Sequence, residues 1–136
     1  MTDTGVLEGG IVLDRGDVYR LLSPADAVRS LREAIIAGAS ENETPRAKIP
    51  EPNGPGTVAV MPSLTAEWLG IKVLSILPEP TPERPAIVGT YLLVDPRDTR
   101  VRATIDGTAL TEVRTSAVSA LALDYLAAPD AARVTV

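Results

Sequence analysis

The chain has 136 residues, of which 45% are hydrophobic and 23% charged, with a formal net charge of -5 and neither His nor Cys. This composition fits one globular domain, and the missing His and Cys exclude a disulfide, a thiol nucleophile and a zinc site of the usual ligands, so no metal is expected. The acidic balance, an aromatic content of 3% and the lack of an apolar run of about 20 residues argue against nucleic-acid and membrane partners.

Residues 1–10 are expected to form a loose leader. They lack the basic flank and the apolar core of a signal peptide, so a cytoplasmic location is expected. Residues 11–13 read as a short strand. Asp14, with Asp17 three residues on, then has the pattern of a capping box and predicts a short helix over about residues 15–22.

Ser23 and Pro24 mark a second helix start, because Ser is a favoured N-cap and Pro is tolerated at the first helical position. Apolar residues then recur at helical spacing, and the positions between them carry charge. Gly38 is a natural stop. The pattern predicts an amphipathic helix packed on the rest of the domain.

The next stretch, residues 41–55, contains four prolines and cannot be regular helix. Residues 57–61 and 69–77 read as strands, and residues 61–63 as a strand end and turn. Residues 78–85 contain four prolines and predict a stiff, polyproline-like connection.

Residues 87–94 and 101–105 are predicted to form a hairpin, followed by a turn at Asp106-Gly107. A long helix then begins at Thr108 or Thr111 and ends before Pro129. Its expected apolar face consists of Val113, Ala117, Val118 and Leu121. The order of elements predicts an α+β fold with a largely antiparallel or mixed sheet, N-terminal helices and a long C-terminal helix.

Three cationic residues have unusual settings: Arg46 follows a proline in a loop, Lys72 interrupts an apolar strand, and Arg114 falls in the expected first turn of the last helix. Together they could form an anion site, with bidentate Arg contacts, a Lys point charge and helix N-terminal donors. Each also has an ordinary interpretation as a solvated surface charge. Spacing alone leaves both interpretations open.

Several short motifs, in this order, resemble the N-terminal part of the ornithine cyclodeaminase/mu-crystallin family. The resemblance spans nearly the whole chain after residue 10. The matching segments are Pro45-Arg46, Met61-Pro62, Gly70-Ile71-Lys72-Val73-Leu74-Ser75, Asp106-Gly107, Leu110-Thr111, Arg114-Thr115, Ser119-Ala120-Leu121 and Leu126-Ala127-Ala128-Pro129-Asp130-Ala131, with Leu22-Ser23 at the start.

The resemblance implies a substrate-binding and dimerisation domain over residues 11–133, followed at residues 134–136 by the start of a nucleotide-binding domain that the sequence does not contain. It implies that Arg46, Lys72 and Arg114 hold the carboxylate of an amino or imino acid, with Met61 and Thr115 beside them. The implied chemistry is hydride transfer to or from NAD or NADP, either with cyclising deamination or as a reduction alone.

Other implications follow from the part of the family pattern that is missing. The family's catalytic acid and its glycine fingerprint belong to the nucleotide-binding domain, so no catalytic residue and no cofactor are expected in this chain alone. Glu83-Arg84-Pro85 stands where the family has Gly-Leu-Pro, and Glu79-Pro80 replaces an Asn that is common in the family. These departures leave the identity of the substrate undetermined.

Two functions remain in competition. The chain is either part of an NAD(P)-dependent enzyme of amino-acid metabolism, a lyase or an oxidoreductase, or a stand-alone carboxylate-binding and dimerisation module without catalysis. A homodimer formed through sheet edges is expected in both cases, because unprotected apolar strands need a partner.

Overall fold

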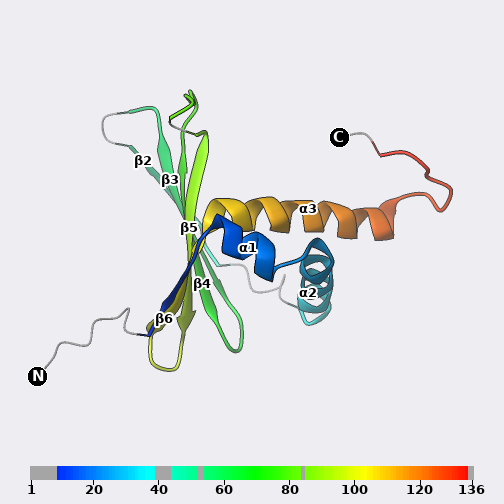
Figure 1. The fold of residues 1–136 in the computed structure, drawn as a ribbon, viewed down its shortest axis with the longest axis horizontal. Coiled ribbons are helices and arrows are strands. Elements are labelled where there is room, and N and C mark those ends of the chain that lie inside the picture. The colour runs from blue at the N-terminus through cyan, green and yellow to red at the C-terminus, as the bar shows by residue number, and fades with distance from the viewer. Residues whose placement is uncertain (1–8, 39–43, 52–53, 84, 135–136) are drawn as a thin grey trace, which may run out of the picture.

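A computed structural model describes residues 9–38, 44–51, 54–83 and 85–134. It contains a six-stranded sheet in the order β1-β6-β5-β4-β3-β2, in which only the β1–β6 pair is parallel. All three helices lie on one side of this sheet (Figure 1). The bounds are β1 Ile11–Leu13, α1 Arg15–Leu21, α2 Pro24–Ile36, β2 Ala47–Pro50, β3 Thr57–Leu64, β4 Leu69–Ile76, β5 Ile87–Asp95, β6 Arg100–Asp106 and α3 Gly107–Leu126. The predicted α+β fold is confirmed.

The first two helices start where the capping signals place them. Asp14 caps α1 through a complete capping box, in which its carboxylate accepts from the Asp17 backbone and the Asp17 carboxylate accepts from the Asp14 backbone. Ser23 caps α2, with Pro24 at the first helical position. Gly38 follows α2 with φ at 80°, a conformation that favours glycine and ends the helix. These predictions are confirmed.

The last helix begins earlier than expected. Asp106 is its N-cap and accepts from the Ala109 backbone at 2.8 Å, so neither threonine is the cap and no separate turn precedes the helix. The Thr108 hydroxyl instead accepts from the Gly89 backbone at 3.0 Å and ties the helix start to β5. Helix α3 therefore rises directly from the end of β6 and projects away from the sheet (Figure 1).

Strands β2 and β3 each differ from the prediction. Strand β2 forms within the proline-rich stretch, where no strand was predicted, and pairs with β3. Strand β3 continues through Pro62, which lies opposite Ile71 on β4, so residues 61–63 are not a turn. Proline is tolerated there because β2 begins opposite Val60, which leaves the other side of β3 unpaired at residue 62.

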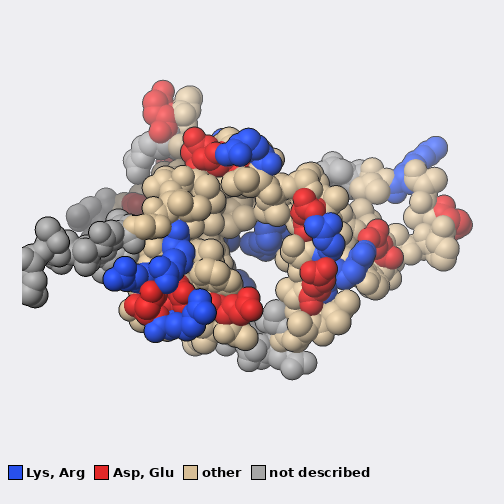
Figure 2. All heavy atoms as spheres, turned by 60° about the horizontal axis from the view of Figure 1, so that its bottom comes forward, with Lys and Arg blue, Asp and Glu red and all other residues tan. Residues whose placement is uncertain are grey.

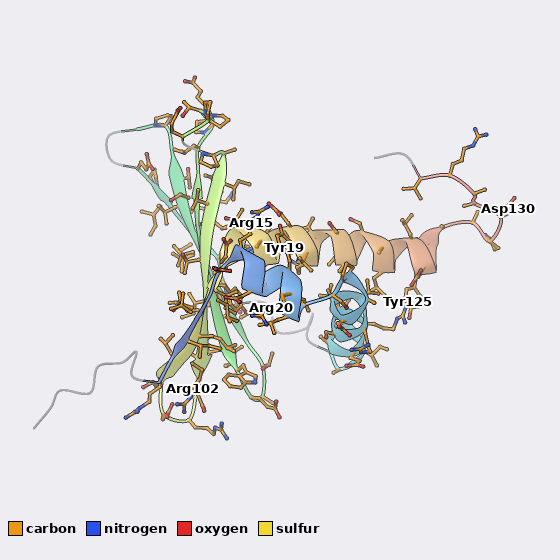
Figure 3. The ribbon with its side chains drawn as sticks, viewed as in Figure 1. Arg15, Tyr19, Arg20, Arg102, Tyr125 and Asp130 are labelled. Atoms are coloured by element: carbon orange, nitrogen blue, oxygen red, sulfur yellow. The ribbon has the colours of Figure 1, made fainter. Side chains whose placement is uncertain are left out.

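The connection between β4 and β5 is a closed hairpin loop and not an extended spacer. The Leu77 backbone donates to the Ala86 carbonyl at 2.8 Å, and turn and bend residues occur among the described residues between them. The β5–β6 hairpin is held differently. Asp95, only 3% exposed, accepts from Arg97 and Arg102, and the Arg97 hydrogen bonds hold the pKa of Asp95 well below its usual range. Arg102 lies at the lower end of the sheet in Figure 3, beside the β5–β6 turn.

The core is made of small and branched aliphatic side chains between the sheet and the helices. Val94 is also buried, but on the opposite face of the sheet, and Val118 on α3 is 41% exposed, so it does not belong to the expected buried face. The buried hydrophobic residues are Val18, Ala27, Ala59, Leu74, Val94, Ala103, Ala109, Ala117 and Leu121.

No described helix is both long enough and apolar enough to cross a membrane.

The opposite face of the sheet carries no helix (Figure 1). Strand register assigns to this uncovered face a continuous set of apolar side chains from β2 to β5. Its members include Ile49, Val58, Val60, Leu64, Ile71, Val73, Val88 and Leu92. Apolar residues on both faces of a sheet are unusual where one face meets water, so this face has the composition of an interface.

Candidate functional site

Lys72 lies on the helix-covered face of β4. Residues two apart on a strand share a face, and Leu74 contacts the junction of Gly89 with Gly107 at the start of α3. Lys72 therefore projects to the same side. Its direct cross-strand neighbours are Met61 on β3 and Tyr91 on β5.

The other two predicted cations lie close enough to Lys72 to perturb it. The pKa of Lys72 is lowered first by partial burial, then by repulsion from Arg114 and Arg46. Arg114 comes from α3, on the helix side of the sheet, and Arg46 comes from the loop immediately before β2. The charges of both arginines therefore act on Lys72, although the three cations come from separate segments of the chain.

None of the three has a carboxylate partner within the part of the chain that the structure describes. Most other described arginines do form ion pairs with Asp or Glu: Arg15, Arg20, Arg29, Arg32, Arg97, Arg100 and Arg102. Arg46, Lys72 and Arg114 have no ion pair and no side-chain hydrogen bond there, and the two arginines repel the Lys72 ammonium. An uncompensated group of this kind favours binding of an anion.

Figure 2 shows an opening between the sheet and the helix layer, with basic side chains beside it. We refer to the space around Arg46, Lys72 and Arg114 as the cationic cleft. A separate hollow, lined by Ala66, Glu67, Trp68 and Arg97, lies at the tips of the β3–β4 and β5–β6 hairpins. It contains none of the three cations.

The position of Arg114 within α3 corrects one expectation. Because α3 starts at Gly107, Arg114 is not in the first turn and lies near the middle of the 20-residue helix. At the N-terminus of α3, Asp106 accepts from the Ala109 backbone, and Gly107 packs against Gly89. Arg114 therefore lies away from this helix end.

The two remaining predicted residues differ in their placement. Met61 lies directly opposite Lys72 on the same face, where its flexible side chain borders the cationic cleft. Thr115 follows Arg114 on α3 and is exposed. No described contact links the Thr115 side chain to Lys72 or Arg46, so its role stays a prediction.

Tyr91 is a cleft residue that sequence reasoning missed. Its hydroxyl lies over Gly70, where a β-carbon would come within 1.8 Å of the oxygen, and burial raises the pKa of this phenol. The ring therefore lies across β4 beside Lys72. Only the strand register reveals this, although a glycine inside an apolar strand is a general signal of close approach by a neighbour.

Helix α3, and Arg114 with it, is braced by α1. The Glu112 carboxylate accepts from Arg15 at 2.8 Å and from the Tyr19 hydroxyl, and these two bonds lower the pKa of Glu112. The Arg15 guanidinium also lies 5.3 Å from the centre of the Tyr19 ring. Arg15 and Tyr19 reach α3 from α1 (Figure 3).

The described helix N-termini can be compared with the N-terminus that a dinucleotide site uses. Such a site needs a glycine turn that leads into an open helix N-terminus. Here the N-termini of α1, α2 and α3 are occupied by Asp14, Ser23 and Asp106, and no glycine-rich turn precedes any of them. No group of three potential metal ligands occurs among the described residues either.

The fold and the cluster of unpaired cations define an α+β domain with a cationic cleft. The chain belongs to the ornithine cyclodeaminase/mu-crystallin family, whose model matches residues 10–136. The resemblance inferred from the motifs is thus confirmed.

Individual relatives agree with this membership. The chain is 34% identical over 83 residues to Protein SAR DEFICIENT 4 of Arabidopsis thaliana, covering 57% of this chain and 26% of the plant protein. It is 32% identical to Delta(1)-pyrroline-2-carboxylate reductase of Thermococcus litoralis, solved with NADH and L-proline, with a TM-score of 0.78 over 88% of this chain and 38% of that one. An archaeal alanine dehydrogenase dimer with bound NAD shares the fold, at 24% identity, a TM-score of 0.78 and coverage of 89% and 38%.

The chain therefore spans less than two fifths of the length of these relatives. Family members include cyclodeaminases and reductases, and the similar solved structures include proteins that bind NAD or NADH.

Proposed function

We propose that this chain is the substrate-binding and dimerising part of an NAD(P)-dependent enzyme that acts on an amino or imino acid. Arg46, Lys72 and Arg114 hold the carboxylate of the substrate, and Met61 and Thr115 border it. The observation that supports this proposal is that both arginines act electrostatically on Lys72, while none of the three cations has a carboxylate partner among the described residues.

The form of the cleft suits a small carboxylate. Two guanidinium groups offer paired donors that match the two oxygens, and one ammonium adds a compact charge. The Thermococcus litoralis reductase was solved with L-proline, a small amino acid of this kind. The family also includes cyclodeaminases.

We place the cofactor outside the described residues, in which the N-termini of α1, α2 and α3 carry side-chain caps. NAD or NADP would bind to a part of the enzyme outside them, and it would supply or accept the hydride at the substrate's α-carbon. This chain's residues would hold the carboxylate and orient that carbon. We propose accordingly that the chain alone does not bind the cofactor.

Dimerisation is proposed through the uncovered face of the sheet, and not through the edges that the sequence suggested. The edge strands are short, with three residues in β1 and four in β2, and β2 ends at a proline that cannot donate to a further strand. The uncovered face offers a larger apolar surface, and a second copy matches it in character.

Carboxylate binding is the direct test. We would titrate the chain with L-proline, L-alanine and L-ornithine, following backbone amide shifts by NMR, and repeat the titrations with L-prolinamide. We expect saturable shifts in β3, β4 and α3 with the carboxylates, none with the amide, and at least about a tenfold loss of affinity in Arg114→Gln, since a charge-assisted contact contributes about 1.5–3 kcal/mol.

Arg133→Gln is the matched control, because Arg133 is also exposed and without an ion pair in the described part of the chain, but lies beyond the end of α3. It should bind like the wild type. Binding that survives in Arg114→Gln, or that accepts the amide equally, would refute the carboxylate site. Saturable binding of NADH would refute the placement of the cofactor elsewhere.

A further inference from the structure

Tyr91 lies beside Lys72 on the same face of the sheet, because Lys72 on β4 and Tyr91 on β5 are direct cross-strand partners. The same cross-strand row continues to Met61 on β3 and to Ile105 on β6. The Met61 and Ile105 side chains contain no N–H or O–H group. Lys72 and Tyr91 are therefore the two residues of this row whose side chains can donate a hydrogen bond.

The position of the Tyr91 ring is set by the strand beside it. A β-carbon at Gly70 would lie 1.8 Å from the Tyr91 hydroxyl oxygen and 2.6 Å from the ring carbon that carries it. The hydroxyl thus occupies the space that a side chain at residue 70 would fill. This space is two residues along β4 from Lys72, which corresponds to about 7 Å in a strand.

The Tyr91 hydroxyl has no hydrogen-bond partner among the described residues, in contrast to the Tyr19 hydroxyl, which donates to Glu112. Tyr91 is half-buried, and burial raises the pKa of its phenol, so the hydroxyl stays protonated and able to donate at neutral pH. Partial burial of a polar group costs free energy that a hydrogen bond offsets. A ligand in the cationic cleft can supply the acceptor.

We propose that the Tyr91 hydroxyl donates a hydrogen bond to the carboxylate of the bound amino or imino acid and so adds an uncharged donor to the three cations. This inference rests on the proposed carboxylate site. One carboxylate oxygen accepts from the flexible Lys72 ammonium, and the other accepts from the hydroxyl fixed over Gly70. Two hydrogen bonds of about 2.8 Å, with the carboxylate between them, bridge a separation of about 7 Å. Because the ring is already in place, little side-chain freedom is lost on binding.

Tyr91→Phe tests the hydroxyl alone, because phenylalanine keeps the ring over Gly70 and removes only the oxygen. We expect the affinity of the whole chain for L-proline, measured by NMR titration, to fall about tenfold, the loss expected for one hydrogen bond to a charged group. Tyr125→Phe is the matched control, because Tyr125 is 66% exposed near the end of α3, and this variant should bind like the wild type. An affinity of Tyr91→Phe within about twofold of the wild type would overturn the inference.

Urea denaturation separates a role in binding from a role in folding. Since the hydroxyl has no partner in the described residues, Tyr91→Phe should not lower the free energy of unfolding of the ligand-free chain. A variant that loses affinity and stability together would assign the hydroxyl a structural role and overturn its role as a donor to the ligand.

The tyrosines themselves report the contact. The chain has three, Tyr19, Tyr91 and Tyr125, so a protein isotopically labelled at the tyrosine ζ-carbon gives three resolvable NMR signals. Saturating L-proline should shift the Tyr91 signal and leave the Tyr125 signal in place, while L-prolinamide should shift neither. A Tyr91 signal that does not move when L-proline is bound would contradict the hydrogen bond.

Failure of the inference and failure of the proposed function give different results. If L-proline binds and Arg114→Gln weakens its binding, but Tyr91→Phe does not, the role of the hydroxyl is wrong and the carboxylate site stands. If the wild-type chain binds none of the carboxylates, both are wrong.

Discussion

Gly107 at the start of α3 lies against the backbone of Gly89 on β5, so closely that a β-carbon at residue 107 would come within 2.7 Å of the Gly89 carbonyl carbon. The added β-carbon would meet backbone atoms of Gly89 and Thr90, and these atoms cannot rotate away as a side chain can. This contact sets where α3 meets the sheet, and with it the position of Arg114 relative to Lys72.

We therefore expect Gly107→Ala to lower the free energy of unfolding by about 3 kcal/mol, the upper range for overpacking at a site that cannot relax. Urea denaturation followed by circular dichroism measures it. Gly16→Ala in α1 is the matched control, because the added carbon would meet only an Asp14 carboxylate oxygen at 3.3 Å, and the change should stay within about 1 kcal/mol. Equal losses in both variants would contradict the close contact at Gly107.

A second glycine makes room for Tyr91. Gly70→Ala is expected to cost about 1–3 kcal/mol, because the new methyl group would overlap the phenol hydroxyl and displace the ring. In a Tyr91→Val background the same substitution should cost much less, since the overlapping atoms are gone. A double-mutant cycle from urea denaturation measures this coupling. Additive effects of the two substitutions would show that Tyr91 does not lie over residue 70.

The sequence allowed the helix starts to be predicted because capping is local. Asp14 with Asp17, and Ser23 with Pro24, act within one turn of the chain. The start of α3 was misplaced for a related reason. Asp106 was assigned to a turn, while the threonines that looked like caps bond elsewhere, as Thr108 does to Gly89.

The cleft was only partly predictable, because its geometry depends on strand register. Lys72 was noticed as a charge in an apolar strand, but nothing local places Tyr91 opposite it or Met61 on its other side. The uncovered face of the sheet could not be predicted for the same reason. Alternation along one strand cannot tell which face the helices will cover when both faces are apolar.

The Lys72 side chain is expected to lower the free energy of unfolding of the chain. Its pKa is lower in the folded chain than its ordinary value of 10.5, so the folded state disfavours the ammonium. Below the folded pKa the amine is charged in both states and the penalty is fully present. As pH rises through the folded pKa towards 10.5, the unfolded chain binds more protons, and the stability contributed at this position increases.

Lys72→Met should therefore be more stable than the wild type at neutral pH, by up to about 1 kcal/mol given how far water screens the open cleft. The gain should shrink as pH approaches 10.5. Urea denaturation of both proteins at several pH values measures it, with Lys48→Met as control. A gain that does not depend on pH would mean that packing, and not charge, is its cause.

The dimer can be tested on the uncovered face. Val88 on β5 belongs to this face and is 50% exposed in the single chain, so the monomer should tolerate a charge there. In a face-to-face dimer the same charge would be buried without a partner, at a cost of several kcal/mol. We expect the wild type to sediment as a dimer at tens of micromolar and Val88→Glu to sediment as a folded monomer. Ile36→Glu is the control, because Ile36 is 77% exposed at the end of α2 on the helix side, and this variant should remain a dimer. A Val88→Glu protein that still dimerises would place the interface on another surface, and a monomeric wild type would remove dimerisation from the proposed function.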